Sequence, residues 1–296
     1  MRVVVAGGSG FLGSPLVAHL RDRGHTVTVL TRRASGGEQE STWDPYGGRL
    51  DQGVIGQADV VVNVAGSGLL GNPHSEKWKR SIRDSRIVTT RVLAEAIARA
   101  DEPPAFLAGN GSSWYGDHGA DPVTEDSDSR GDAFMTQVTR DWQAAADPAL
   151  EAGARVCVLR TAPVMSRGGE TMKLLEPLFK LGLGARLGRG EQFFPVISRR
   201  DWVAAVAMLA EHPTASGPIN LCSPVTPTNA EFTATFARSV HRPAFLAAPR
   251  RVLSVGAGPA APELLRSLDL RPAALLSLGY RFEDPDVSAV LASGLA

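Results

Sequence analysis

Short runs of apolar residues alternate along the chain with longer stretches in which apolar and polar positions follow a helical period. Residues 2–6 form a β-branched run that predicts a buried strand. Similar runs predict further strands at residues 25–30, 59–63, 105–108, 156–159 and 217–222. The helical period predicts helices over residues 11–23, 85–100 and 201–211. Strands that alternate with helices predict an α/β fold with a parallel sheet and right-handed crossovers.

The composition narrows the class of protein. Of the 296 residues, 43% are hydrophobic, so the chain can bury a substantial core. Lys plus Arg and Asp plus Glu both number 31. A net charge of zero argues against broad binding to nucleic acid or to an anionic membrane. No apolar run reaches the roughly 18 residues of a membrane helix, and no signal peptide is evident. We therefore expect a cytoplasmic protein.

Cysteine and histidine give little support for metal or disulfide chemistry. Cys157 and Cys222 lie in apolar runs, which favours buried, reduced thiols. The six histidines are scattered without ligand spacing, so no metal site is expected.

The clearest motif is the glycine-rich run at residues 7–13, between the first predicted strand and the first predicted helix. Gly7 and Gly10 would permit a tight turn and the close approach of a diphosphate, and Gly13 would let the helix pack on the sheet. Phe11 and Leu12 complete the turn at the helix N-terminus, where free N–H groups and the helix dipole favour anions. Because a predicted strand and a predicted helix flank it, this motif indicates dinucleotide binding much more specifically than an isolated glycine pattern does. We predict dinucleotide binding.

The end of the second predicted strand indicates which dinucleotide is bound. NAD-binding units usually carry Asp or Glu there, but this chain has Thr31, Arg32 and Arg33. Two guanidinium groups suit a 2′-phosphate, so NADP(H) is favoured over NAD, although a solvated surface pair is the alternative. After the strand at 59–63, the small residues Val64, Ala65 and Gly66 would let the backbone pass close to the cofactor.

The sequence resembles the atypical short-chain dehydrogenase/reductases, in the branch described as epimerase family, nucleoside-diphosphate-sugar epimerase-like or cell-division-inhibitor-like. The motifs that carry the resemblance cover nearly the whole chain and lie at residues 7–13, 43–45, 63–66, 78–90, 114–117, 142, 168–169, 188–192, 219–232, 242–243 and 279–282.

The resemblance implies a Rossmann-type doubly wound parallel sheet with a smaller C-terminal substrate domain. The cofactor domain would span residues 1–165, with 198–222 returning to it. The substrate domain would comprise residues 166–197 and 223–296, with helices at 171–181 and 229–240.

The resemblance also places residues around the cofactor. Trp43 would lie near the adenine, although a core position is equally favoured, and Arg86 would lie on a helix that faces the cofactor. Asn110 and Gly111 occupy positions where small hydroxyl residues are usual. The predicted cofactor-binding set is Gly7, Gly10, Phe11, Leu12, Gly13, Thr31, Arg32, Arg33, Trp43, Asn63, Val64, Ala65, Gly66, Arg86, Asn110, Gly111, Arg160, Pro163 and Val164.

The catalytic pattern of the superfamily is missing. Phe134 and Val138 stand where its members carry the Tyr and Lys of a YxxxK motif, and neither side chain can exchange a proton. The candidate catalytic residues are therefore Tyr115, whose usual role is packing, and the hydroxyls of Ser112 and Ser113.

Two further regions have candidate roles. Gln192, Arg199 and Arg200 would line the substrate side, unless they form a solvated turn. The six acidic residues between 117 and 132 indicate a solvated lid rather than a metal site.

Three functions remain open from the sequence. The first is an NADP(H)-dependent oxidoreductase or isomerase that acts on a small carbonyl or hydroxyl compound. The second is an NADPH-binding regulator or sensor with little or no turnover, and the third is a nucleotide-sugar epimerase. In each case the expected partner is a small molecule, and the oligomeric state is left open, with a dimer as one alternative.

Overall fold

The computed structural model describes residues 1–33, 37, 39–249 and 261–296. Within them, a sheet of seven parallel strands runs through the molecule in the order β11-β7-β5-β4-β1-β2-β3. This arrangement confirms the predicted Rossmann-type α/β class. The strands are β1 (Arg2–Ala6), β2 (Thr26–Thr31), β3 (Glu40–Thr42), β4 (Val60–Asn63), β5 (Ala105–Gly111), β7 (Val156–Thr161) and β11 (Gly217–Leu221).

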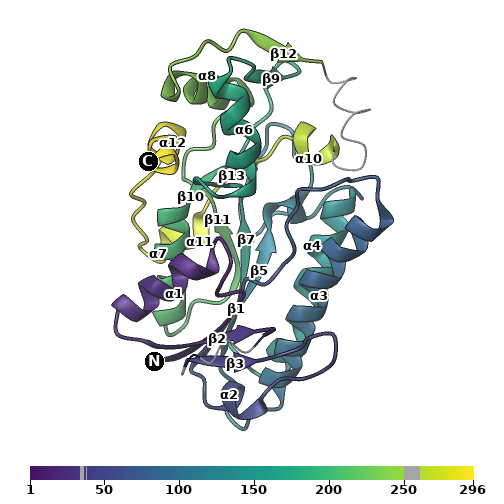
Figure 1. Cartoon of the computed structure of the whole chain (residues 1–296), viewed down its shortest axis with the longest axis vertical. Helices are drawn as coiled ribbons and strands as arrows, with labels where there is room; N and C mark the ends of the chain where they lie inside the picture. The colour runs from purple at the N-terminus through teal and green to yellow at the C-terminus, as the bar shows by residue number, and fades with distance from the viewer. Residues whose placement is uncertain (34–36, 38, 250–260) are drawn as a thin grey trace.

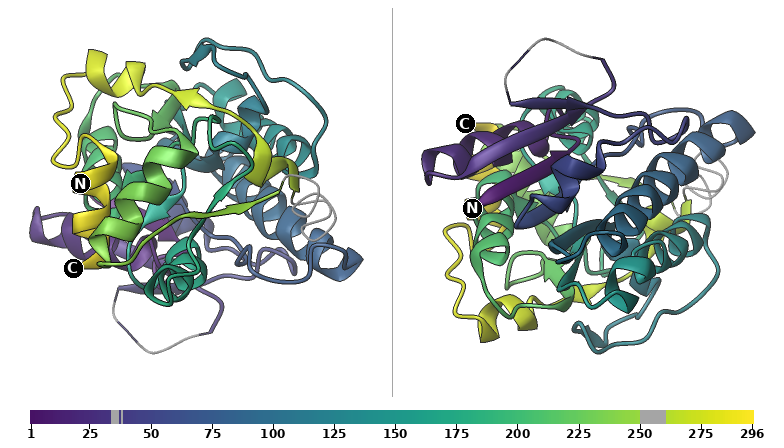
Figure 2. Two further views of the ribbon diagram at one scale, coloured as in Figure 1. Left: turned by 90° about the horizontal axis from the view of Figure 1, so that it is seen from above. Right: turned by 90° about the horizontal axis from the view of Figure 1, so that it is seen from below.

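Helices cover both faces of this sheet (Figures 1 and 2). One face carries α1 (Gly13–Asp22) and α7 (Arg199–Glu211), and the other carries α2 (Gln52–Gly56), α3 (Glu76–Ala98), α4 (Phe134–Ala144) and α5 (Asp147–Glu151). Along β1, Val3 and Val5 pack toward α1 and α7, whereas Val4 and Ala6 pack toward α3. Burial on both faces explains why the strands are continuous apolar runs rather than alternating ones.

A second layer lies beyond the upper end of the sheet (Figure 1). It contains α6 (Glu170–Lys180), β9 (Ala185–Leu187), α8 (Asn229–Ser239), β12 (Leu246–Ala248) and α12 (Val287–Leu295). Its core includes the stacked rings of Phe179 and Phe236, whose centroids lie 4.2 Å apart. The short parallel pair β8 (Val164–Met165) and β10 (Ile197–Ser198) joins this layer to the sheet.

The segment that follows β12 returns toward the sheet. It contains α10 (Ala261–Leu265), β13 (Asp269–Leu270), which pairs with β6 (Pro122–Val123), and α11 (Ala273–Ser277). Leu275 packs in the same core as α1 and α7. Asp201, fully buried on α7, accepts hydrogen bonds from the backbone N–H groups of Glu283 and Asp284. The C-terminal residues therefore contact both layers, and the expected domain boundaries stay a prediction.

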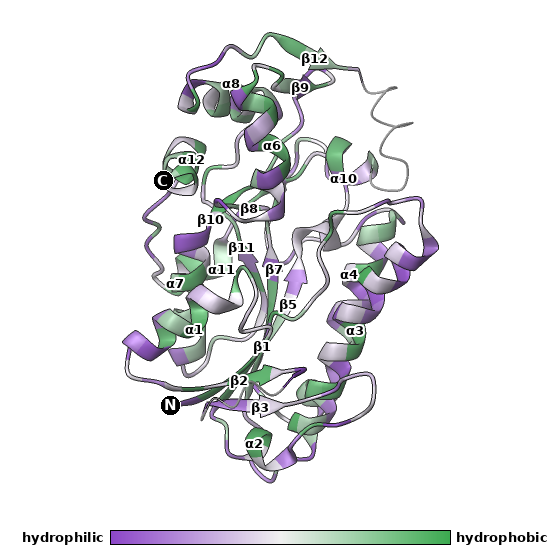
Figure 3. Ribbon diagram, viewed as in Figure 1, coloured by the Kyte–Doolittle hydropathy of each residue, from purple (hydrophilic) through white to green (hydrophobic). Residues whose placement is uncertain are grey.

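Several element boundaries differ from the sequence prediction. Helix α3 begins nine residues before the predicted start, because Ser75 caps it by accepting a hydrogen bond from the Trp78 N–H. Figure 3 shows hydrophilic residues recurring along α3, which weakened its apolar period. Helix α1 begins at Gly13 rather than at Phe11. Strand β3 and helix α2 were not predicted. In the described ranges, none of the helices combines the length and apolar character of a membrane span.

Candidate functional site

The glycine-rich loop between β1 and α1 is packed so closely that side chains are excluded. Gly7 has φ +82°, and a Cβ atom there would lie 2.7 Å from the backbone N of Ala65. A Cβ atom on Gly13 would overlap the carbonyl oxygen of Gly7 and lie 2.8 Å from Gly8 Cα. The loop thus lies directly against the start of α1 on one side and the end of β4 on the other.

The N-terminus of α1 is open to an anion. Among the described residues no side chain caps it, and its first turn holds no acidic residue. Free N–H groups and a helix dipole at this position favour a phosphate.

The end of β4 is held in shape by Asn63, which is fully buried. Its side-chain amide donates to Thr90 Oγ1 at 2.9 Å, and its Oδ1 accepts from the Ala65 N–H at 3.0 Å. These bonds fix the turn at residues 63–66 beside the glycine loop. The structure thereby brings the loop and the predicted residues Val64 to Gly66 together.

The end of β2 carries three of the predicted cofactor residues. Thr31 Oγ1 is sealed from solvent and has no hydrogen-bond partner among the described residues. Arg32 and Arg33 are exposed and form no ion pair with the described residues. Trp43, only 3% exposed, packs in the core below α3, which favours a core role for this residue. The site fits a dinucleotide: the loop excludes side chains, the N-terminus of α1 lies at one end, and Arg32 and Arg33, without an ion pair among the described residues, lie at the other.

Arg86 lies beside this turn, on α3. It is 8% exposed, and its guanidinium carbon would be 3.6 Å from a Cβ atom on Gly66. Burial lowers the pKa of Arg86 to about 10, while the nearby Glu170 carboxylate raises it.

A second set of polar residues follows β5. Asn110 donates from its side chain to the Thr139 carbonyl oxygen and accepts from the Gly111 N–H. Ser113 Oγ donates to Glu263 Oε2 at 2.8 Å. Arg266 donates to the carbonyl oxygen and the hydroxyl of Ser112, at 3.0 and 3.2 Å.

Glu263 and Arg266 were missed from the sequence. They lie about 150 positions after the serines in the chain, on and just after α10, and form an ion pair of 3.3 Å. No motif marks them, so only the tertiary structure could reveal this contact.

The structure does not bring Tyr115 and Arg160 to the glycine loop. The Tyr115 hydroxyl is buried, donates to Asn220 Oδ1 at 2.7 Å and accepts from Arg160 Nη1 at 2.8 Å. Arg160 also stacks 3.5 Å from the ring centroid of Trp114 and bonds to Gln143. Burial raises the pKa of Tyr115 to about 12, although Arg160 opposes that shift. Both polar groups are therefore committed to contacts inside the protein.

We expect Tyr115→Phe to destabilise the fold rather than to remove a catalytic proton. The change leaves Arg160 without one buried acceptor and Asn220 without one buried donor, which costs about 1–3 kcal/mol. Urea unfolding would measure this loss, with the exposed Tyr46→Phe as the control. An unchanged unfolding midpoint together with lost turnover would instead support a catalytic Tyr115.

Helix α4 carries the two substitutions that break the catalytic pattern. Phe134 packs on Trp78 with ring centroids 5.9 Å apart, and Val138 is fully buried. Trp142, one turn further, donates from Nε1 to Thr90 Oγ1 at 2.8 Å. This face of α4 therefore packs through apolar side chains at the two positions where the resemblance predicts the Tyr and Lys of a YxxxK motif.

The acidic loop at residues 117–132 is solvent-exposed at its acidic residues, as predicted, except at Glu125. Asp128 and Asp121 pair with Arg130, and Asp132 pairs with Arg140. Glu125 turns inward and accepts from the backbone N–H groups of Asn220 and Ala274. Burial raises the pKa of Glu125. The loop is thus pinned to the sheet edge by one of its own carboxylates.

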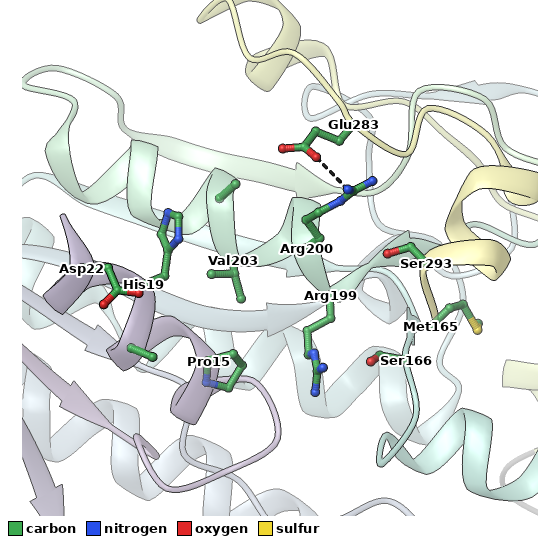
Figure 4. A pocket seen from close by; sticks show the side chains of 12 residues that line it. Pro15, His19, Asp22, Met165, Ser166, Arg199, Arg200, Val203, Glu283 and Ser293 are labelled. Carbon is green, nitrogen blue, oxygen red and sulfur yellow. Dashed lines mark ion pairs between the residues drawn. The ribbon is translucent and has the colours of Figure 1, made fainter. Parts of the chain in front are cut away.

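Of the expected substrate-side residues, Arg199 lies beside the glycine loop, with its guanidinium carbon 5.5 Å from the ring centroid of Phe11. Arg199 and Arg200 line a cavity of about 450 Å³ between α1 and α7. In Figure 4, Arg200 faces Glu283, with which it forms an ion pair of 2.8 Å, while Arg199 points the other way, toward Pro15 and Ser166. Gln192 donates to the Leu187 carbonyl oxygen, within the second layer.

Pro163 and Val164 lie where the chain leaves the sheet for the second layer. Val164 pairs with Ile197, and the Pro163 carbonyl oxygen accepts from the Ile197 N–H.

Comparisons with known proteins agree with this geometry. The model of the NAD dependent epimerase/dehydratase family matches residues 3–222. Epimerase family protein Mb2239 of Mycobacterium bovis is 39% identical over 290 residues, covering 98% of this chain and 96% of the relative. Epimerase family protein SDR39U1 of Homo sapiens is 34% identical over 296 residues, covering 98% of each chain.

Solved structures are similar along the whole chain. The crystal structure of human epimerase family protein SDR39U1 (isoform2) with NADPH matches with a TM-score of 0.87 and 32% identity, covering 99% of both chains. The crystal structure of a nucleoside-diphosphate sugar epimerase from Corynebacterium glutamicum matches with a TM-score of 0.81 and 31% identity. That match covers 100% of this chain and 58% of the other.

Proposed function

The chain belongs to the NAD-dependent epimerase/dehydratase family, and on that premise we propose that it is an NADP(H)-dependent oxidoreductase or isomerase of a small carbonyl or hydroxyl compound. The observation that carries the proposal is the packing of the glycine loop. Gly7 packs against the backbone of the turn at residues 63–66, and Gly13, at the start of α1, packs against the Gly7 carbonyl group. Such packing places the loop backbone at the N-terminus of α1, the arrangement in which dinucleotide-binding folds hold a diphosphate.

The choice of NADP(H) rests on the end of β2. Arg32 and Arg33 have no carboxylate partner among the described residues, so a 2′-phosphate would meet two cations there. The human relative, whose crystal structure holds NADPH, supports this choice.

The residues after β5 are the ones we propose for proton handling. The bound nicotinamide supplies or accepts a hydride. A carbonyl compound that accepts the hydride at its carbon also needs a proton on its oxygen, and an alcohol that gives up the hydride must release its hydroxyl proton. The Ser113 hydroxyl, hydrogen-bonded to Glu263, can hold the substrate oxygen and pass a proton to or from that carboxylate. Arg266 pairs with Glu263 and keeps it oriented.

A regulatory or sensor protein without turnover is the second candidate. It is favoured by Phe134 and Val138, which replace ionisable groups with apolar packing. Nucleotide-sugar epimerisation ranks last, because its usual route relies on the tyrosine and lysine that these residues replace.

The proposal is tested by combining cofactor binding with a substrate panel. NADPH at about 100 times its dissociation constant should contribute about 2.7 kcal/mol of stability and raise the melting temperature by several degrees. A panel of aldehydes, ketones and quinones should then change the nicotinamide absorbance of NADPH, and Ser113→Ala should slow that change. Tight NADPH binding with no change across a wide panel favours the regulator, and absence of binding overturns both proposals.

A further inference from the structure

Arg86 is a buried cation that forms no ion pair with the described residues. Among the described residues its hydrogen bonds run only from Nη1, to the Ile82 carbonyl oxygen at 3.1 Å and to Ser85 Oγ at 3.4 Å. Glu170 influences it electrostatically, but the Glu170 carboxylate accepts instead from the Leu69 N–H at 2.6 Å.

The remaining donors of Arg86 are unpaired but not sealed. In the described part of the chain, the sealed side-chain atoms without a partner are Thr31 Oγ1, Glu125 Oε2 and Asp269 Oδ1. The Nε and Nη2 atoms of Arg86 are not among them, so both keep contact with solvent although the residue is only 8% exposed. A guanidinium presents such a pair of N–H groups in the geometry that two anionic oxygens match.

The surroundings hold the guanidinium in place beside the cofactor loop. It lies 5.4 Å from the ring centroid of Trp142 on one side. On another side Gly66 leaves room, because a Cβ atom there would already contact the guanidinium at 3.6 Å. Ser85, which also accepts from Arg86, links the guanidinium to the segment after β4, because its hydroxyl accepts from the Ser67 N–H at 3.0 Å.

An isolated buried charge is costly, and burial lowers the pKa of Arg86 to about 10 without neutralising it at physiological pH. An anion that pairs with Arg86 would offset this free-energy cost and stabilise the protein. The guanidinium lies beside Gly66, which follows β4, and in the sheet β4 lies between β5 and the strand β1 that leads into the glycine loop.

We propose that Arg86 is an anion receptor that binds two oxygens of a phosphate or carboxylate group at the cofactor–substrate junction. This inference rests on the proposed function and deepens it, because the group belongs either to the cofactor diphosphate or to an acidic substrate.

The test replaces Arg86 by Met, which has a similar volume and no charge. The exposed Arg83→Met on the same helix, which loses only its surface pair with Asp141, is the control. Because Arg86 forms no ion pair with the described residues, the ligand-free R86M protein should melt at the same temperature or about 2–4 °C higher. Arg86→Lys keeps the positive charge but loses the paired N–H groups of the guanidinium. This variant should retain part of the affinity for the anion.

Three titrations identify the source of the anion. A diphosphate contact predicts that R86M weakens NADPH, and inorganic pyrophosphate on cofactor-free protein, about 10- to 100-fold. A substrate contact predicts unchanged NADPH binding, but loss of the thermal shift that malonate or inorganic phosphate gives the NADPH-loaded wild type. The pyrophosphate titration still reports on Arg86 if the protein binds no nicotinamide cofactor, so the two proposals fail separately.

Two results would overturn the proposal. One is that R86M binds every probe as tightly as the wild type does. The other is that it loses binding together with a lowered melting temperature in the absence of ligand, which would mark Arg86 as a structural residue.

Discussion

Replacing Arg32 and Arg33 together by alanine is expected to raise the dissociation constant for NADPH about 100-fold and to change that for NADH by less than about threefold. Charge-assisted hydrogen bonds contribute about 1.5–3 kcal/mol each, and about 2.7 kcal/mol corresponds to 100-fold. Both arginines are exposed and form no ion pair with the described residues, so little stability should be lost. Fluorescence titration of both cofactors against the double variant measures the discrimination.

Arg49→Ala is the matched control for this experiment. Arg49 is an exposed arginine near the same edge of the sheet, and its contact with Asp44 is a weak one of 4.0 Å. It should leave both affinities unchanged. An equal loss of NADPH and NADH binding in the double variant would refute the 2′-phosphate assignment.

Gly13→Ala is expected to abolish NADPH binding, with the dissociation constant rising more than about 100-fold, and to lower the melting temperature by several degrees. The new methyl group would overlap the Gly7 carbonyl oxygen and press on Gly8. Helix α1 would have to move away from the loop, and the N–H groups that face the diphosphate would move with it. Overpacking of this kind typically costs about 1–3 kcal/mol.

Gly56→Ala is the control for the added methyl group. Gly56 ends helix α2, has ordinary backbone geometry, and would leave a new Cβ atom with no neighbour within 4 Å. This variant should be neutral or slightly stabilising. Calorimetry and NADPH titration on both variants decide the matter: a G13A protein that binds NADPH like the wild type would show that the glycine loop is not the cofactor site.

The strands were predictable because their burial is complete on both sides. In β1 and β4 every buried position except Asn63 is apolar or small, so the run itself marks the strand. The glycine loop was predictable for a related reason, since few side chains fit between packed backbones. Strand β3, with residues that are only partly buried, leaves no such trace.

The direction of individual side chains was harder to predict. Arg160 follows Leu159 in β7, and the alternation of the strand turns it toward α4, where Trp114 and Tyr115 enclose it. A one-residue shift in the assumed register of the strand would turn Arg160 to the opposite face of the sheet. The contact between Ser113 and Glu263 depends on how the last third of the chain folds back toward the end of β5. No local sequence pattern predicts this contact.

The strand order has a consequence for how the protein is made. Strand β11 completes the sheet beside β7, but the ribosome must first produce residues 162–216, which include α6, β9 and α7. At about 5–20 residues per second, the open edge of β7 waits roughly 3–11 seconds for its neighbour. An unpaired edge of this kind attracts other strands, so the nascent chain is most prone to aggregate in that interval.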